Sequence, residues 1–367
     1  MRFFITAALV VAPAVLAAQQ PGKQPSRDSS SANAAAGTRT VIRGLYVNRW
    51  AAQSRPKMRS LIALAHETGL NALVIDLKDE FGLNYHPTDS VAKQFAGNAG
   101  AIPDIRWLLD TMKAVGLVPI ARMVTFKDSV TARARPDWTI LGPDGHPWRD
   151  KQGLTWVNPY NRDLWDYDLR VATELAHLGF AEIQFDYIRF PEPYPSLPKQ
   201  SFPGANGVAK QDALAAFLKE AHARLAPLGV RTTADVFGLT TTVKGALEVG
   251  QQWEALAPVA DVLLPMVYPS HYVHGSFGIQ SPNSEPYQIV KTAVSKAVER
   301  NTALGLTGER VRPYLQAFTL GKPAYGDAEL AAQFKATHEA GAGGFILWNP
   351  GSKYELYRAA LIEEGKR

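Results

Sequence analysis

The chain has 367 residues, 46% hydrophobic and 20% charged, which is an ordinary composition for a globular protein. The net charge is only +5 and the 39 Lys and Arg residues are scattered, with no basic run of the kind that follows a phosphate backbone, so we expect no nucleic-acid partner. Cysteine is absent, which excludes disulfides, thiolate nucleophiles and Cys-ligated metals.

The first residues predict export. Arg2 precedes an apolar run from Phe3 to Leu16, and Ala17 and Ala18 follow. This is the pattern of a secretory signal peptide, over residues 1–18. The run is short for a membrane span, so we expect no stable span after cleavage; a retained anchor is the alternative. Residues 19–38, rich in Pro, Ser, Ala and Gly, predict a flexible linker before a folded domain over 39–367, in a secreted or periplasmic protein.

From residue 41 onward, short β-rich runs alternate with stretches of helical period. The runs predict strands over 41–48, 71–78, 117–124, 181–190, 231–239, 261–269, 312–319 and 343–350. The stretches between them predict helices over 56–69, 102–116, 162–179, 209–227, 250–257, 286–304, 327–340 and 353–364. Strict alternation predicts an α/β fold, a single (β/α)8 TIM barrel with a long loop after strand 3. A doubly wound sheet is the alternative, but the first turn, "VNRWAAQSRP", lacks its glycines.

Polar residues collect at the downstream ends of these strands, where barrel active sites lie. An unpaired charge inside an apolar run is costly, so this pattern indicates function, although a salt-bridged rim would produce it too. The candidates for substrate binding at these ends are Asn48, Asp76, Lys78, Glu80, Arg122, Arg189, Tyr268, His271, Gln316 and Trp348.

Asp186 and Asp235 fall on neighbouring predicted strands, which lie about 4.8 Å apart. Their carboxylates are therefore expected at roughly 5–6 Å, the spacing of a retaining glycosidase, in which one attacks the anomeric carbon and the other protonates the leaving oxygen. Close like charges also raise one pKa, as an acid catalyst requires. The alternatives are that Asp235 only orients substrate or Arg189, and that Asp76 with Glu80 supplies a wider-spaced second carboxylate, which implies inversion.

The loop after the third strand, roughly residues 126–160, is long enough to suggest function. Trp138, Trp148 and Trp156 lie in it, and two roles are open: they stack on sugars, or they form a small core that pins the loop to the barrel. His271 is the one histidine placed just after a strand. No HExxH, paired-His, EF-hand or G-x-S-x-G pattern occurs, so we expect no metal site and no cofactor.

Seven motifs stand in order along the chain: "GLYVNRW", "VIDLKDE", "PDW…DGHPWRD…GLTWVNPYN", "FDYIRFP", "ADVFGL", "LPMVYPSHY" and "GFILWNP". Together, over about residues 41–355, they resemble the bacterial putative glycosyl hydrolase domain family, a TIM-barrel family related to the α-amylase-like glycoside hydrolases. The resemblance implies a barrel with Asp186 as nucleophile. The α-amylases differ at three places: Gln184 stands where they have Arg, Asp235 where they have Glu, and Gln316 where they have His-Asp.

These observations predict an exported glycoside hydrolase that cleaves a polysaccharide by a two-carboxylate mechanism. The three departures from the α-amylases motivate an alternative, a carbohydrate-binding barrel without catalysis. A hydrolase of another envelope bond, an ester or an amide, would need a nucleophile or metal site that the sequence does not display.

Overall fold

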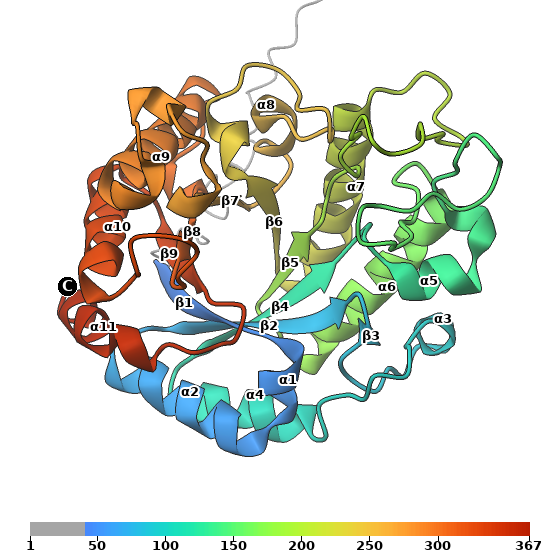
Figure 1. Cartoon of the computed structure of the whole chain (residues 1–367). Coiled ribbons are helices and arrows are strands. Elements are labelled where there is room, and N and C mark those ends of the chain that lie inside the picture. Colours follow the sequence, from blue (N-terminus) through green and yellow to red (C-terminus); the bar gives the residue numbers. More distant parts are fainter. Residues whose placement is uncertain (1–40) are drawn as a thin grey trace, which may run out of the picture. The chain divides into compact units, whose positions relative to one another are not determined.

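Eight parallel strands close into a barrel in the computed structural model, which describes residues 41–367 (Figure 1). The predicted signal peptide and linker lie outside the described residues. The barrel strands are β1 (Ile42–Val47), β2 (Ala72–Asp79), β4 (Val118–Val124), β5 (Glu182–Asp186), β6 (Arg231–Phe237), β7 (Val262–Met266), β8 (Tyr314–Gln316) and β9 (Gly344–Trp348). The pairing of β1 with both β2 and β9 closes the ring. This confirms the predicted barrel and excludes the doubly wound sheet.

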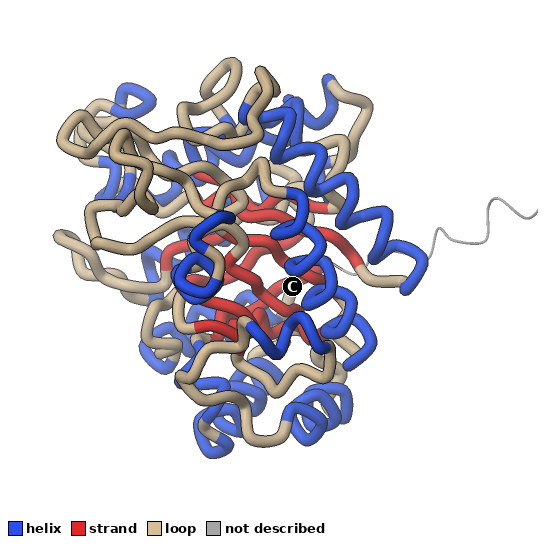
Figure 2. The backbone as a smooth tube through the Cα atoms, turned by 90° about the vertical axis from the view of Figure 1, so that its right-hand side faces the viewer, coloured by secondary structure: helices blue, strands red, loops and turns tan. Residues whose placement is uncertain are grey.

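One helix follows each barrel strand and packs outside it (Figure 2). In order these are α2 (Arg55–Glu67), α4 (Ile105–Ala114), α6 (Arg162–Leu178), α7 (Lys210–Leu225), α8 (Trp253–Leu256), α9 (Pro286–Ala303), α10 (Asp327–Glu339) and α11 (Arg358–Gly365). The shorter elements α1 (Arg49–Gln53), β3 (Gly82–Leu83), α3 (Ser90–Gln94) and α5 (Ser129–Ala134) lie in the loops. Within residues 41–367, no helix is both long and apolar enough to span a membrane.

Local sequence explains where these helices begin and end. The side chain of Asn161 accepts a hydrogen bond from the Leu164 N–H at the start of α6, and Gly179 ends this helix with a φ of 112°. Only glycine adopts such a backbone conformation without strain, so the predicted helix stop is confirmed.

Apolar side chains form two concentric layers. The outer layer lies between strands and helices; Phe185 of β5, for example, meets Phe217 of α7 edge-on at 5.3 Å between ring centroids. The inner layer fills the barrel, with Ile42, Tyr46, Ala72, Val74, Ile120, Val262, Leu264, Tyr268, Tyr314 and Ile346. Strands buried on both faces explain the nearly continuous apolar runs of the sequence.

A buried ion pair closes the N-terminal end of the barrel. Glu182, the first residue of β5, accepts hydrogen bonds from Arg312 at 2.7 and 3.2 Å and lies 2.9 Å from Arg231. Burial would raise the pKa of Glu182, but the two arginines outweigh it and hold the pKa below its usual range. This end contributes to stability, which leaves the opposite end for chemistry.

The long loop after β4 is confirmed and is held against the barrel. Isolated bridges pair Thr139 with Val157 and Arg149 with Thr155. Its tryptophans, Trp138, Trp148 and Trp156, are all buried. The indole N–H of Trp148 donates to the Pro198 carbonyl, and that of Trp156 donates to Asp150, both at 2.9 Å. Of the two roles predicted for these residues, the structure therefore shows the small core and not exposed sugar platforms.

Candidate active site

A pocket of about 560 Å³ opens at the C-terminal ends of the strands. Six of the residues expected at this end line it: Arg122, Asp186, Arg189, Tyr268, His271 and Trp348. The other lining residues are Tyr187, Glu192, Tyr194, Phe237, Gly238, Leu239, Met266 and Tyr272. The pocket therefore belongs mainly to the ends of β5, β6, β7 and β9 and to the loops that follow them.

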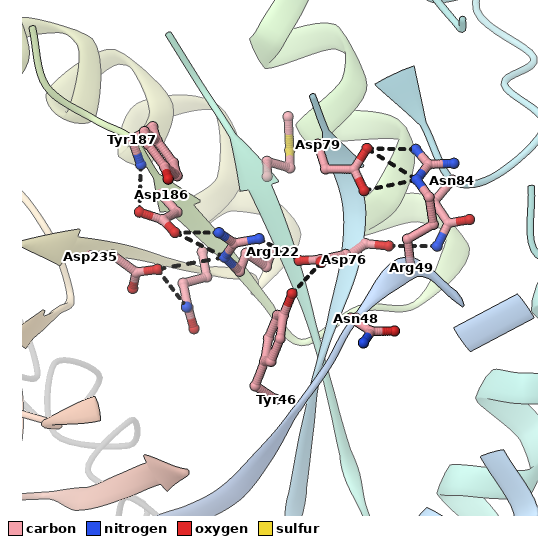
Figure 3. Close-up of polar contacts among 12 residues, drawn as sticks. Tyr46, Asn48, Arg49, Asp76, Asp79, Asn84, Arg122, Asp186, Tyr187 and Asp235 are labelled. Atoms are coloured by element: carbon pink, nitrogen blue, oxygen red, sulfur yellow. Dashed lines mark hydrogen bonds and ion pairs between the residues drawn. The ribbon is translucent and has the colours of Figure 1, made fainter. Parts of the chain in front are cut away.

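The guanidinium of Arg122 lies at the floor of this pocket among three carboxylates (Figure 3). Its Nη1 donates to Asp76 at 2.5 Å, and its Nε donates to Asp186 Oδ2 at 3.0 Å, an oxygen that Nη2 also contacts. The same Nε lies 3.9 Å from Asp235 Oδ2. One cation thus faces three nearly buried acids, an arrangement that favours protonation of the acids that the cation does not compensate.

Strand register explains why these residues meet. Arg122 of β4 is paired with Asp76 of β2 on one side and with Gln184 of β5 on the other. Asp186 is two residues beyond Gln184 and therefore points to the same side of β5, toward the barrel axis. Gln184 and Asp186 therefore face inward and Phe185 faces the helices, as regular strand alternation predicts.

Both oxygens of Asp186 are hydrogen-bonded: Oδ2 to Arg122 and Oδ1 to the backbone N–H of Tyr187 at 2.6 Å. Tyr187 has a φ of 50°, an uncommon value for a residue with a side chain. Strand alternation predicts that Tyr187 faces the helices, and this expectation is wrong. The positive φ breaks the alternation directly after β5, and Tyr187 lines the pocket beside Asp186.

Asp235 is not among the residues that line the pocket, and only 1% of its surface is exposed. Its Oδ2 accepts a hydrogen bond from Gln184 Nε2 at 3.0 Å, while its Oδ1 has no hydrogen-bond partner. Burial, and next the charge of Asp186, raise the pKa of Asp235 well above its ordinary value; Arg122 and Gln184 offset this only partly. The geometry therefore places a carboxyl group that favours its protonated form next to Asp186.

Asp76 holds Arg122 rather than lining the pocket. Its Oδ1 binds Arg122, and its Oδ2 accepts a hydrogen bond from the Tyr46 hydroxyl at 2.5 Å. Burial raises the pKa of Asp76 to about 6, although Arg122 lowers it. The Tyr46 ring stacks on the pocket residue Trp348, with centroids 3.8 Å apart. Asp76 is not among the residues that line the pocket, so the predicted contact with substrate is corrected: Asp76 positions Arg122.

The pocket walls combine aromatic and polar groups. Arg189 donates to Glu192 at 3.0 Å, and its guanidinium lies 4.7 Å from the ring centroid of Phe237. His271 Nδ1 lies 3.0 Å from the Ser270 hydroxyl. Burial lowers the pKa of His271, which favours a neutral imidazole. Such walls offer hydrogen bonds together with flat apolar surface, as sugars require.

Lys78 is a second correction. Its ammonium is completely buried and contacts Asp128 at 2.8 Å, Asp168 at 3.1 Å and the Val124 carbonyl at 2.8 Å, away from the pocket. A register shift in β2 explains this placement, because Asp76 pairs with Arg122 but Lys78 pairs with the very next residue, Met123. This β-bulge turns Lys78 from the barrel axis toward the helices.

Three other predicted residues also lie outside the pocket lining. Asn48 caps α1, and its Nδ2 donates to the Pro350 carbonyl at 2.8 Å. Gln316 is fully buried; it accepts from the Ser270 N–H and donates to the Phe318 carbonyl, which ties two loops together. Glu80 is exposed just after β2. We predicted that Asn48 and Gln316 contact substrate; in the structure they instead support the loops.

Sequence reasoning missed several lining residues at the end of the fourth and fifth barrel strands or just after them, namely Tyr187, Glu192, Tyr194, Phe237, Gly238 and Leu239. The "PEPYP" stretch after β5, which carries Glu192 and Tyr194, was the available signal, because an ordered proline-rich loop at this end of a barrel lies beside the site. Within residues 41–367, no group of three or more His, Asp or Glu side chains has an arrangement that could hold a metal ion.

Residues 44–354 match the model of the family described as "putative glycosyl hydrolase domain". The chain belongs to this family. The resemblance carried by the seven motifs is thereby confirmed. No curated protein matches the sequence.

Solved structures show the same barrel. The glycoside hydrolase domain of PgaB (BpsB) from Bordetella bronchiseptica is 15% identical, with 88% of this chain and 98% of that one covered and a TM-score of 0.64. The spore cortex-lytic enzyme SleL of Bacillus megaterium QM B1551 is 14% identical, covering 89% and 74%, with a TM-score of 0.54. A hypothetical protein from Ruminiclostridium thermocellum ATCC 27405 is 34% identical over 52% of this chain and 97% of that one, with a TM-score of 0.48. The first two likenesses establish the fold.

Proposed function

We propose that this protein is a glycoside hydrolase that cleaves a glycosidic bond of a polysaccharide with two carboxyl groups, Asp186 and Asp235. One observation carries the proposal: at the floor of the pocket, Asp186 is ion-paired with Arg122, and beside it Asp235 has a raised pKa. A glycosidase needs this pair of states, an ionised group at the anomeric carbon and a protonated group at the leaving oxygen.

Asp186 is the group that meets the sugar, because it lines the pocket. It attacks the anomeric carbon or stabilises the positive charge that develops there. Arg122 and the Tyr187 N–H hold this carboxylate in one orientation, so little reorganisation is needed during the reaction. Arg189, Tyr268, His271 and Trp348 surround the sugar ring and position it.

Asp235 donates the proton to the leaving oxygen. The Oδ2 atoms of Asp186 and Asp235 contact the same nitrogen of Arg122, at 3.0 and 3.9 Å, and so lie at most about 7 Å apart. Retaining enzymes hold their carboxyl groups about 5–5.5 Å apart and inverting enzymes about 6.5–9.5 Å apart. The anomeric configuration of the first product distinguishes the two courses.

The proposed substrate is a polysaccharide outside the cytoplasm, because residues 1–18 have the pattern of a secretory signal. Family membership supports a glycosidic bond as the target. The names of the two structural neighbours, a glycoside hydrolase domain and a spore cortex-lytic enzyme, agree with this class of substrate by analogy of fold.

A second candidate is a carbohydrate-binding barrel without catalysis. One observation favours it: Asp235 is buried and does not line the pocket, so the side chains that line the pocket separate its carboxyl group from a bound sugar. The purified protein, offered a panel of glycol chitin, hydroxyethyl cellulose, xylan, pullulan and peptidoglycan, separates the candidates. Release of new reducing ends supports the hydrolase, whereas retention on a glycan with no release supports the binding barrel.

A further inference from the structure

Exposed aromatic side chains are rare on this molecule. Among the Phe, Tyr and Trp side chains within residues 41–367, only Trp50, Phe81 and Tyr194 are exposed, at 56%, 45% and 41%. Each follows a barrel strand at the C-terminal end: Trp50 lies in α1 after β1, Phe81 lies between β2 and β3, and Tyr194 follows β5. Tyr194 lines the pocket already described. Trp50 and Phe81 are left without an assigned role.

Trp50 and Phe81 form a pair. Their ring centroids are 5.7 Å apart and the ring planes are inclined by 55°. Although they belong to two different loops, they meet on the surface, where neither ring is needed to fill the core. Exposed aromatic clusters of this kind mark binding surfaces more often than isolated exposed residues do.

A buried ion pair fixes the backbone beneath both rings. Arg49, next to Trp50, donates to both oxygens of Asp79 at 2.8–3.0 Å and also to the carbonyls of Gly82 and Gly100. The N–H of Phe81 donates to the same Asp79 carboxylate at 2.9 Å. Figure 3 shows Arg49, at the start of α1, and Asp79, at the end of β2, facing one another. The two rings are therefore presented on a rigid support, which lowers the entropy lost when a ligand binds.

This pair continues from the pocket along the rim. The strands that precede Trp50 and Phe81, β1 and β2, lie between β9 and β4 in the barrel, and β9 and β4 supply the pocket residues Trp348 and Arg122. Tyr46 of β1 also stacks on Trp348. The C-terminal rim therefore leads from the pocket directly onto the loops that carry Trp50 and Phe81. A linear polymer that enters the pocket and runs along this side passes over both rings.

We propose that Trp50 and Phe81 form a stacking subsite for a second sugar unit of the polysaccharide whose bond is cleaved at Asp186. The chemistry fits, because the flat C–H face of a sugar packs on an exposed aromatic ring. The inference rests on the proposed function for the identity of the polymer. It adds a subsite that favours long chains over short ones.

The test compares Trp50→Ala and Phe81→Ala with the wild-type full chain, each also carried in an Asp186→Asn background. Affinity electrophoresis in glycol chitin, hydroxyethyl cellulose, xylan, pullulan and solubilised peptidoglycan measures binding, and reducing-end release measures cleavage. For the glycan that the wild type binds, we expect each substitution to weaken binding roughly tenfold. We expect Trp50→Phe to retain most of the affinity. Trp107 of α4 is half-buried and does not line the pocket, so Trp107→Ala is the matched control and should bind as wild type.

The outcomes separate the two proposals. Binding that depends on Trp50 without any cleavage supports the subsite and contradicts the hydrolase. Cleavage of the polymer that is indifferent to both substitutions overturns the subsite and leaves the hydrolase standing. If the wild type binds none of the glycans, or if analytical ultracentrifugation shows instead a dimer that Trp50→Ala abolishes, the sugar subsite is wrong.

Discussion

Arg122 and Gln184 are register partners on the neighbouring strands β4 and β5, and between them they hold the two proposed catalytic acids. Arg122 binds Asp186, and Gln184 binds Asp235. In the sequence-based resemblance to the α-amylases, Gln184 stands where those enzymes have an arginine, and this difference was one reason to consider a barrel without catalysis. The structure supplies the guanidinium from the adjacent strand instead. This relocation weakens that reason, and it makes Arg122 the residue on which the geometry of the site depends.

Replacing Arg122 by lysine should disable the site while keeping a positive charge. A lysine cannot bridge Asp76 and Asp186 with separate nitrogens, so the carboxylates lose their fixed orientation. We expect kcat/KM to fall about 100-fold or more and stability to fall by about 1.5–3 kcal/mol, because a hydrogen bond to a charged group is lost while the positive charge remains. Enzyme kinetics and urea unfolding measure the two effects. Arg55→Lys, in an exposed pair with Asp104, is the control and should change neither.

Trp348 should contribute to substrate binding. Its ring is stacked on Tyr46 and faces the pocket, so it can pack on a sugar without moving. We expect Trp348→Ala to raise KM roughly tenfold, because an aromatic contact is worth about 1 kcal/mol or slightly more. Trp348→Phe should retain much of the affinity. Equal KM values for wild type and Trp348→Ala would show that the sugar does not use this wall.

Lys78 should matter for stability and not for chemistry. Its ammonium is buried between Asp128 and Asp168, and removing it leaves two acids without their cation. We expect Lys78→Met to lower the free energy of unfolding by about 3–5 kcal/mol. Turnover per folded molecule, measured at a temperature where the variant is folded, should stay within about twofold of wild type. A selective loss of kcat in a fully folded variant would instead place Lys78 at the substrate.

The same cluster should make stability depend on pH. Burial raises the pKa of Asp168 to about 7, above its value in the unfolded chain. Below the unfolded pKa both states hold the proton, and as pH rises through the folded pKa the buried carboxyl loses it at a cost to folding. We therefore expect the stability of wild type, relative to Asp168→Asn, to fall between about pH 4 and pH 7 and then to level off. Urea unfolding of both proteins across this range measures the difference. If the stability of wild type relative to Asp168→Asn rose with pH instead, the Asp168 carboxylate would be stabilised in the folded protein.

Much of this structure could be predicted because its strands are buried on both faces. That burial gives eight apolar runs in regular alternation with helices, which is enough to predict the barrel, its C-terminal site and the inward position of Asp186 and Gln184. Local departures from regular backbone geometry could not be predicted. The bulge that turns Lys78 outward and the positive φ that brings Tyr187 into the pocket depend on neighbouring strands and loops, and alternation fails at both.

Composition also left the long loop ambiguous. The sequence cannot distinguish a sugar-stacking surface from a small core at Trp138, Trp148 and Trp156, since both roles favour large aromatic residues. Only tertiary contacts, such as the indole of Trp148 on the Pro198 carbonyl, decide between them. The exposure of Trp50 and Phe81 could not be predicted either, because each is a single aromatic residue just after a predicted strand and the sequence does not show whether it packs inward.

Asp186 provides the most direct test of the account. The measurement is reducing-end release from the polysaccharide that the wild type cleaves, with Asp186→Asn and Asp235→Asn assayed alongside and glycan binding determined for all three. Asparagine matches aspartate in size but can neither attack the anomeric carbon nor carry the proton. We predict that Asp186→Asn lowers kcat by about 1,000-fold or more with binding preserved, and that Asp235→Asn removes the alkaline limb of the residual pH profile. Cleavage by Asp186→Asn at the wild-type rate, or equal binding by both proteins with no cleavage by either, would contradict the proposed mechanism.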